Sequence, residues 1–101
     1  MNTVKRKRIE VLADAPLLPR LLDALRASGV TGHTVLPASS GAGAHGNWSD
    51  DGLTGTAKLV LMTVTTEAHA TDLVDRLAPL LDSHRLLLTM SDVDVVRGDR
   101  F

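Results

Sequence analysis

The order of helix-like and strand-like segments is the feature that most restricts how this chain can fold. Leucines recur at helical spacing over residues 15–28, and a second apolar stripe with the same spacing follows Thr66. Each helical segment lies between two segments rich in β-branched or apolar residues, which are expected strands at 4–13, 30–38, 57–66 and 85–90. The chain therefore reads, in order, strand, helix, strand, strand, helix, strand.

Short signals mark where these segments begin and end. Asp14 is a suitable N-cap for the first helix, and Gly29 is suited to end it in a left-handed conformation. Pro79 is expected to kink the second helix or to begin a separate final turn. After the last strand, a second apolar series extends or follows it: Val93, Val95 and Val96.

This order predicts an α+β fold of the ferredoxin-like βαββαβ type. Two right-handed crossovers place both helices on one face of a four-stranded antiparallel sheet. The other face is left bare, although strand 57–66 is apolar enough to be covered on both sides. Such a face is expected to pack against copies of the same chain, which predicts a trimer. With 101 residues, the chain is expected to form a single domain, 1–101.

Composition argues against several classes of function. The net charge is −1 and no basic run is interleaved with aromatic residues, so nucleic-acid binding is not expected. Without cysteine, and with four histidines far apart in sequence, no metal site is expected. No apolar run approaches the ~20 residues of a membrane span, and no signal peptide follows the basic start. We therefore expect a cytoplasmic protein without membrane insertion.

Residues 39–56 are expected to form a long irregular loop. They hold five of the eight glycines together with serines, asparagine and aspartates, a composition that buries little apolar surface. A loop of this length in a small domain is usually functional or disordered. Its glycines at 41, 43 and 46 would let backbone N–H groups approach a phosphate.

Two stretches carry a resemblance to a known family. Residues 29–35, Gly-Val-Thr-Gly-His-Thr-Val, followed by a Gly-x-Gly and a further glycine, resemble the signature of PII signalling proteins. Residues 91–101 resemble the last strand of that family, which carries two arginines near its end. The loop pattern Gly-x-Gly-x-His-Gly-x-Trp is most similar to the carboxysome-associated PII-like branch. One departure is Asp82-Ser83-His84-Arg85, where the family has Gly-Asp-Gly-Lys.

The resemblance implies a regulatory protein rather than an enzyme, with no catalytic residues and no covalent cofactor. It would bind ADP or AMP, with bicarbonate as a further ligand, in the cleft between the subunits of a homotrimer. Residues 39–56 would be the flexible T-loop, which orders with the ligand and signals to a bicarbonate transporter or carboxysome component. The implied nucleotide- and anion-binding residues are Thr34, Ser40, Gly41, Gly43, His45, Gly46, His84, Arg85, Arg97 and Arg100.

Two other functions fit the same fold. One is a trimeric metal-binding or scaffold protein of the CutA type, against which the lack of cysteine and of clustered histidines counts. The other is a small ferredoxin-like enzyme that uses the sheet face as a pocket. That enzyme would need a titratable group among strand-face residues, which here are mostly leucine, valine and methionine.

Overall fold

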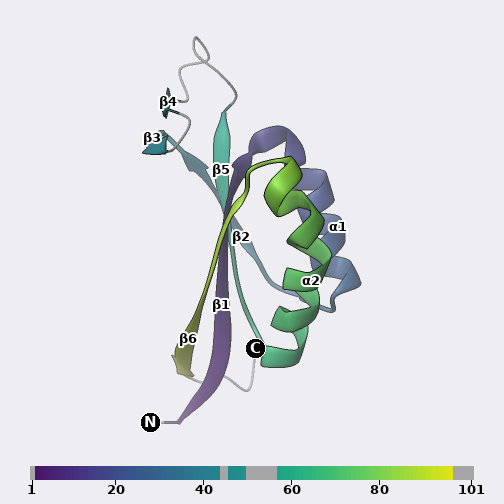
Figure 1. The fold of residues 1–101 in the computed structure, drawn as a ribbon. Coiled ribbons are helices and arrows are strands. Elements are labelled where there is room, and N and C mark those ends of the chain that lie inside the picture. Colours follow the sequence, from purple (N-terminus) through teal and green to yellow (C-terminus); the bar gives the residue numbers. More distant parts are fainter. Residues whose placement is uncertain (1, 44–45, 50–56, 97–101) are drawn as a thin grey trace.

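A computed structural model describes residues 2–43, 46–49 and 57–96. Its two α-helices and one short 3-10 helix alternate with six strands in chain order (Figure 1). The elements are β1 (Thr3–Asp14), η1 (Ala15–Leu17), α1 (Leu18–Ala27), β2 (Thr34–Ala38), β3 (Ser40–Gly43), β4 (Gly46–Ser49), β5 (Lys58–Thr65), α2 (Glu67–Ser83) and β6 (Leu87–Val96).

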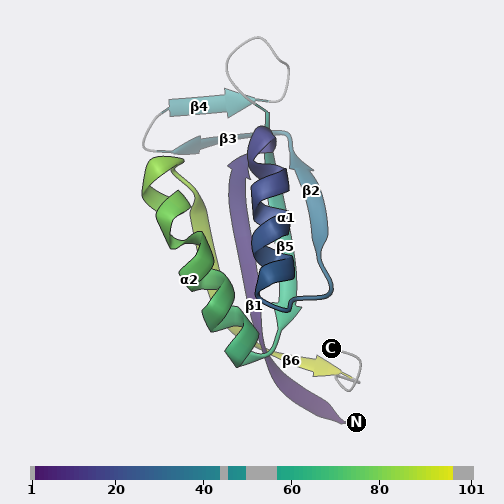
Figure 2. The ribbon, with the colours of Figure 1, turned by 90° about the vertical axis from the view of Figure 1, so that its right-hand side faces the viewer.

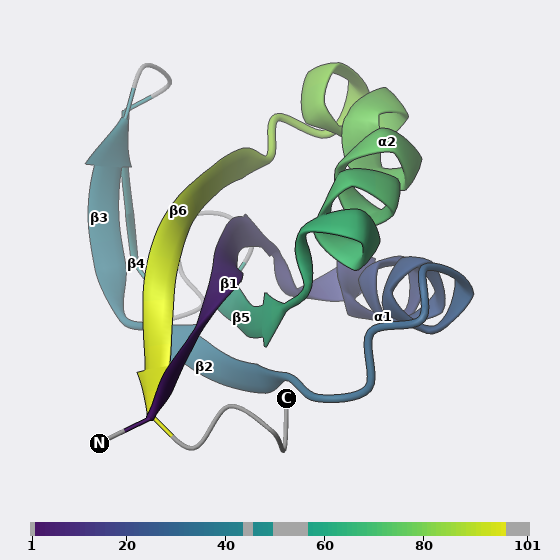
Figure 3. The same cartoon turned by 90° about the horizontal axis from the view of Figure 1, so that it is seen from below.

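The main sheet has the strand order β2-β5-β1-β6, and every neighbouring pair is antiparallel. Both helices lie on one face of this sheet, as Figures 1 and 3 show. The two central strands, β1 and β5, are therefore joined to their partners by two crossovers that run through the helix layer. This arrangement confirms the predicted ferredoxin-like βαββαβ fold.

The core lies between the sheet and the helices. Alternate residues of β1 and β5 point into it, because successive side chains of a strand face opposite sides. Leucines from α1 and α2 fill the space opposite them. The core residues with the least exposure are Ile9, Val11, Leu21, Leu25, Leu61, Ala70, Leu73 and Leu77.

The first helical segment ends as the sequence predicts but begins differently. Residues 15–17 form a 3-10 turn rather than α-helix, and α1 starts at Leu18 with a proline in its first turn. Gly29 has a φ of +84°, and the N–H of Val30 bonds to the carbonyl of Leu25 at 3.0 Å. This pattern satisfies a carbonyl of the last helical turn that would otherwise be unpaired.

The second helix is one continuous element, without a separate final turn after Pro79. Thr66 caps it as its side-chain oxygen accepts a hydrogen bond from the backbone N–H of His69 at 3.3 Å. The helix then runs without interruption through Pro79 to Ser83, so the expected separate turn is wrong. Proline removes only its own N–H from the helical hydrogen bonds, and Pro79 is exposed, where water can reach the freed carbonyl.

Three strand boundaries also differ from the predictions. The second strand begins at Thr34 rather than at residue 30, since Val30 is buried at the end of α1 instead. The last strand begins at Leu87 and continues unbroken to Val96. The expectation of an irregular loop is wrong for eight residues of 39–56, because β3 and β4 pair as an antiparallel hairpin (Figure 2). Backbone pairing orders these residues without any need for apolar side chains.

Candidate functional site

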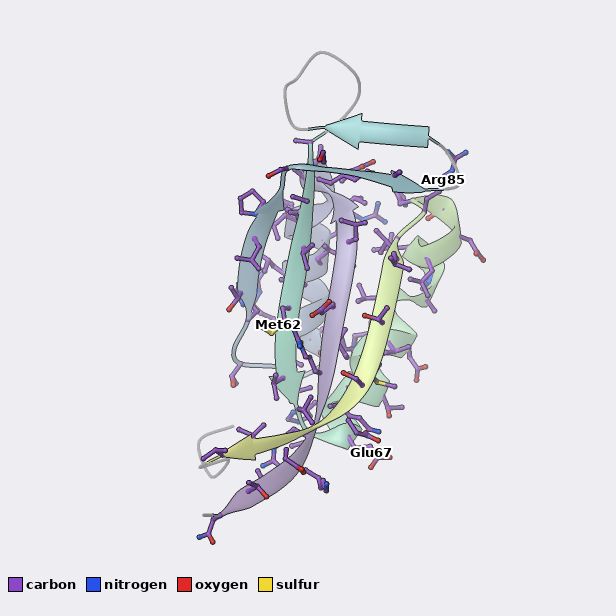
Figure 4. The ribbon with its side chains drawn as sticks, turned by 90° about the vertical axis from the view of Figure 1, so that its left-hand side faces the viewer. Met62, Glu67 and Arg85 are labelled. Carbon is purple, nitrogen blue, oxygen red and sulfur yellow. The ribbon has the colours of Figure 1, made fainter. Side chains whose placement is uncertain are left out.

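The face of the sheet opposite the helices carries an apolar row that crosses all four strands. We call this side the bare face; Figure 4 views it directly and places Met62 near its middle. The register pairs Leu36 with Val60, Val60 with Leu12, and Leu12 with Leu87. Leu36 is 51% exposed and Leu87 is 59% exposed. We refer to these four residues as the cross-sheet row.

Charged residues on the bare face pair with one another. Arg8 and Glu10, both on β1, form an ion pair beside the cross-sheet row. Lys58 and Asp14 form another at 2.6 Å, where β5 and β1 meet. Strand β5 alternates between buried and half-buried residues, so the chain itself covers only one of its faces. The sequence predicts that this strand is covered on both faces, and within the described residues the helices cover one of them.

The hairpin formed by β3 and β4 projects from the bare-face side of the sheet (Figures 1 and 3). Its register pairs Ser40 with Ser49, Gly41 with Trp48, and Gly43 with Gly46. A Cβ atom added to Gly43 would meet no heavy atom within 4 Å. The described part of the chain therefore leaves open space beside this glycine, and a ligand could approach the backbone there.

Strand β2 leads directly to the hairpin along an open edge of the sheet. It is the outer strand beside β5, so one row of its backbone N–H and C=O groups has no strand partner within the described residues. Thr34 begins this strand, is exposed, and shares the bare face with its neighbour Met62. From Thr34 to Ala38 the strand extends about 13 Å.

The turn between α2 and β6 contains a residue with unusual backbone geometry. Arg85 has a φ of 54°, the only positive φ of a non-glycine residue in the described chain. Its side chain is exposed and makes no hydrogen bond or ion pair within residues 2–43, 46–49 and 57–96. His84 precedes it at the C-cap of α2, where its backbone N–H bonds to the carbonyl of Leu80 at 3.0 Å.

Figure 4 shows how the hairpin and this turn lie relative to each other. Strand β3 starts at the β2 edge and runs across the end of the sheet toward the corner where Arg85 lies. Seen from below, the hairpin stands out from the sheet, with β6 between it and the helices (Figure 3). The glycine end of the hairpin and Arg85 therefore lie at the same end of the sheet, although the hairpin stands out from the bare face and Arg85 lies in the turn between α2 and β6.

The predicted site residues thus fall into groups. Thr34, Ser40, Gly41, Gly43 and Gly46 follow one another along β2 and the hairpin. His84 and Arg85 lie at the neighbouring corner of the sheet. The three remaining candidates, His45, Arg97 and Arg100, lie outside the described residues.

Sequence reasoning missed Arg20, an exposed residue in the first turn of α1. Its Nη1 lies 3.4 Å from Nε2 of His84, across the two helices. Nothing near Arg20 in the sequence indicates this contact, because it depends on how α1 packs beside α2.

A separate cleft of about 300 Å³ lies at the opposite end of the sheet. Figure 4 places Glu67, one of its lining residues, far from Arg85. Lys5 pairs with Asp94 at 2.6 Å, and Lys7 pairs with Asp92. The hydrogen bond to Asp92 raises the pKa of Lys7, and the same bond lowers the pKa of Asp92. Two of the four cations at the start of β1, Lys5 and Lys7, are thus paired with carboxylates of β6.

Two further observations limit the chemistry of the described chain. No group of three or more histidine, aspartate or glutamate residues within it could hold a metal ion. Neither α1 nor α2 is long and apolar enough to cross a lipid bilayer.

A βαββαβ sheet with an apolar row across its bare face and a glycine-rich hairpin at its end defines a ferredoxin-like domain suited to assemble through its sheet. More specifically, the chain belongs to the P-II family. The sequence profile of that family, Nitrogen regulatory protein P-II, matches residues 6–100. The resemblance predicted from residues 29–46 and 91–101 is therefore confirmed at the level of the family.

Solved structures of similar fold agree with this assignment. CPII, a nitrogen regulatory PII-like protein from Thiomonas intermedia K12 bound to ADP, AMP and bicarbonate, is 22% identical, with a TM-score of 0.89 over 99% of this chain and 96% of that chain. A PII-like signalling protein from Thermus thermophilus is 24% identical, with a TM-score of 0.82 over 100% and 99%. The GlnK–ATP complex from B. subtilis is 13% identical, with a TM-score of 0.63 over 88% and 82%. No curated protein matches the chain.

Proposed function

We propose that this protein is a regulatory P-II family member that binds ADP or AMP between the subunits of a homotrimer. The observation that carries the proposal is that an open glycine hairpin runs across the same end of the sheet at which Arg85 has no bonding partner within the described residues. Backbone N–H groups without side chains around them, together with a guanidinium, suit the oxygens of a phosphate. Thr34 and the open edge of β2 offer polar groups to the base or the ribose.

The trimer is part of this proposal because one chain leaves both the site and the sheet incomplete. The cross-sheet row exposes leucine side chains that water solvates poorly, and packing against two further copies would cover them. The hairpin projects from this same side, so a neighbouring subunit would lie next to it. The candidates Arg97 and Arg100 would complete the phosphate contacts from that neighbour.

The ligand would act on the segment 39–56, the T-loop of the family. Its described part holds a hairpin of only four residue pairs, and a two-stranded hairpin of this length is marginally stable by itself. A phosphate bound at Ser40, Gly41, Gly43, His45 and Gly46 would fix one conformation of this segment. A partner that binds one conformation better than the other would then report the ligand.

The proposed biological setting is inorganic carbon metabolism in the cytoplasm. Support comes from the fold relative that was solved with ADP, AMP and bicarbonate. Bicarbonate is accordingly the second ligand proposed here, and a bicarbonate transporter or carboxysome component is the proposed partner. The protein would regulate this partner and would not itself catalyse a reaction.

Isothermal titration calorimetry with AMP, ADP, ATP and cyclic AMP, each with and without bicarbonate, tests the proposal. We expect saturable binding of ADP or AMP, with one site for each subunit. Gly43→Val should weaken binding while the fold and oligomer persist, because a Cβ atom there meets no heavy atom of the described residues within 4 Å. Gly32→Val is the matched control, since that glycine also has open space around its Cβ position but lies before β2. Absence of heat with all four nucleotides would refute the proposal.

A further inference from the structure

The side chains of Arg20, Ser83 and His84 form a continuous chain of contacts between α1 and the end of α2. Nη1 of Arg20 lies 3.4 Å from Nε2 of His84. Nδ1 of the same imidazole lies 2.7 Å from Oγ of Ser83. That hydroxyl in turn donates to the backbone carbonyl of Pro79 at 2.9 Å. Each ring nitrogen of His84 therefore has a defined neighbour.

These contacts fix which nitrogen of His84 carries its proton. The Ser83 hydroxyl uses its hydrogen on the carbonyl of Pro79, so toward the imidazole its oxygen is the acceptor. Nδ1 of His84 is accordingly the donor. A guanidinium has donors only, so Nε2 must accept from Arg20 with its lone pair. The arrangement describes a neutral imidazole protonated at Nδ1.

A second proton on His84 would change this contact from attractive to repulsive. Nε2–H and Nη1–H would then be two cationic donors facing each other about 3.4 Å apart. An oxyanion placed between them would accept from both and remove the repulsion. The hydrogen bonds of Arg20 and His84 can thus be satisfied in two ways. In one the histidine is neutral, and in the other it is protonated and an anion is bound.

We propose that Arg20 and His84 form a proton-dependent binding site for a phosphoryl group, in which His84 takes up a proton from solvent as the anion binds. This inference rests on the proposed function, because the phosphoryl group is that of the bound ADP or AMP. It adds Arg20 as an anion ligand on α1, next to the corner where Arg85 lies. No covalent bond forms or breaks; Nε2 gains one proton and the anion accepts hydrogen bonds from Nε2 and Nη1.

The charged groups around His84 favour an anion there. From α1 it is faced by Arg20, and Asp23, one turn further on, already pairs with Arg26. The charged residues nearest to it along the chain are Asp82 and Arg85, neither of which is ion-paired within the described chain. The first four residues of β6 carry no charge, and neither do the eight residues of β3 and β4. Among the charged groups named here, Asp82 is the carboxylate that would oppose the anion.

The test is calorimetry of ADP binding to the full-length oligomer between pH 7.0 and 8.5, in buffers with different ionisation enthalpies. Over this range the nucleotide phosphates stay largely ionised, so a change in affinity reports on a group of the protein and not on the ligand. We expect uptake of part of a proton on binding, and an affinity that falls severalfold, up to about tenfold, for each pH unit gained.

Two variants separate this mechanism from a structural role. In His84→Gln the side-chain oxygen can still accept from Arg20 but cannot be protonated, so the affinity should become independent of pH. Arg20→Gln should weaken ADP binding severalfold at every pH while the unfolding temperature and the oligomer stay unchanged. Arg76→Gln, which removes another exposed arginine of the helix layer, is the control and should bind like the wild type.

The possible outcomes are distinguishable. ADP binding without proton uptake, or a pH dependence that survives in His84→Gln, would overturn this inference and leave the proposed function standing. Unchanged affinity in Arg20→Gln would also overturn it. No ADP binding at any pH would overturn both.

Discussion

Arg85 is held in a backbone conformation that costs an arginine about 1 kcal/mol and would cost a glycine far less. Its side chain nevertheless bonds to nothing in the described chain. The fold alone therefore gives no reason for an arginine at this position, whereas a phosphate ligand would.

Arg85→Gly separates these two roles. Relief of the positive φ offsets the larger conformational entropy that glycine loses on folding, so the unfolding temperature should stay unchanged or rise slightly. Loss of a charge-assisted hydrogen bond should weaken ADP binding by roughly tenfold or more. Thermal unfolding and calorimetry on the same preparation measure both. A variant that is less stable and yet binds ADP normally would show that Arg85 serves the fold.

Gly29 is the opposite case, a glycine that the fold itself requires. Its φ is +84°, and an added Cβ would lie 3.1 Å from Nε2 of His69. Gly29→Ala should therefore lower the free energy of unfolding by about 1–2 kcal/mol. For a domain of this size the unfolding temperature falls by roughly 4–8 °C for each kcal/mol.

Gly32→Ala is the matched control for this substitution. Gly32 has no positive φ and no heavy atom within 4 Å of its Cβ position. Both variants should be compared with the wild type at one protein concentration, because assembly contributes to stability. Equal stability of Gly29→Ala and Gly32→Ala would contradict the assigned conformation of Gly29.

At the scale of elements, the repeating patterns of the sequence predicted most of the fold. Leucines at helical spacing located α1 and α2, and β-branched runs located β1, β2, β5 and β6. These elements bury side chains, and burial leaves a periodic pattern in the sequence. The hairpin of β3 and β4 was missed because its backbone pairs while its residues are mostly glycine, alanine and serine. No side-chain pattern is needed for such pairing.

In the candidate site, too, some residues could be predicted from the sequence and others could not. The glycines were predicted from their backbone chemistry and the arginines from the family resemblance, and the structure places Arg85 at the end of the sheet that the hairpin crosses. Arg20 was not predicted, since its contact with His84 joins residues 64 positions apart. Sequence spacing predicts contacts within one element, whereas contacts between elements depend on how the elements pack.

The ion pair between Lys7 of β1 and Asp92 of β6 makes the stability of the sheet depend on pH. The hydrogen bond from Lys7 lowers the pKa of Asp92 in the folded protein. The stabilisation of the fold by this ion pair is therefore complete above the ordinary carboxyl pKa of 3.8, and it is lost as the pH falls through the lowered pKa. Asp92 raises the pKa of Lys7, so the stabilisation holds below 10.5 and is lost as the pH rises through the raised value. The ion pair should therefore stabilise the sheet throughout the neutral range.

Asp92→Asn tests this dependence. Because Asp92 is exposed, we expect a small shift of the urea midpoint at pH 7 that is reduced by salt and is smaller at pH 2.5. Asp75→Asn is the control, since Asp75 is exposed on α2 and forms no ion pair in the described chain. A difference between Asp92→Asn and the wild type that is the same at both pH values would mean that the ion pair is not its cause.

For the molecule as a whole, the bare face connects the fold to the proposed function. The sheet contributes one face to the core and leaves the cross-sheet row on the other, at the side from which the hairpin projects. The same packing that covers this row would bring a second chain to the hairpin. Assembly and ligand binding are therefore expected to fail together when the row is changed.

Val60→Glu is the substitution that tests this link. Val60 lies between Leu36 and Leu12 in the row, and it points away from the core, so the single chain should still fold. A carboxylate buried between subunits without a partner costs several kcal/mol, enough to disrupt a small interface. Light scattering should then give the mass of one 10.8 kDa chain instead of three, with an unchanged circular dichroism spectrum.

Ala78→Glu supplies the control, because it adds the same charge to an exposed position on α2, within the helix layer. This variant should remain trimeric and bind ADP normally. The Val60→Glu monomer should lose ADP binding although every site residue of its own chain is intact, since the neighbouring subunit no longer completes the cleft. If the Val60→Glu monomer binds ADP as tightly as the wild type, the nucleotide binds within one chain. If Val60→Glu remains a trimer, the subunits do not assemble through the bare face.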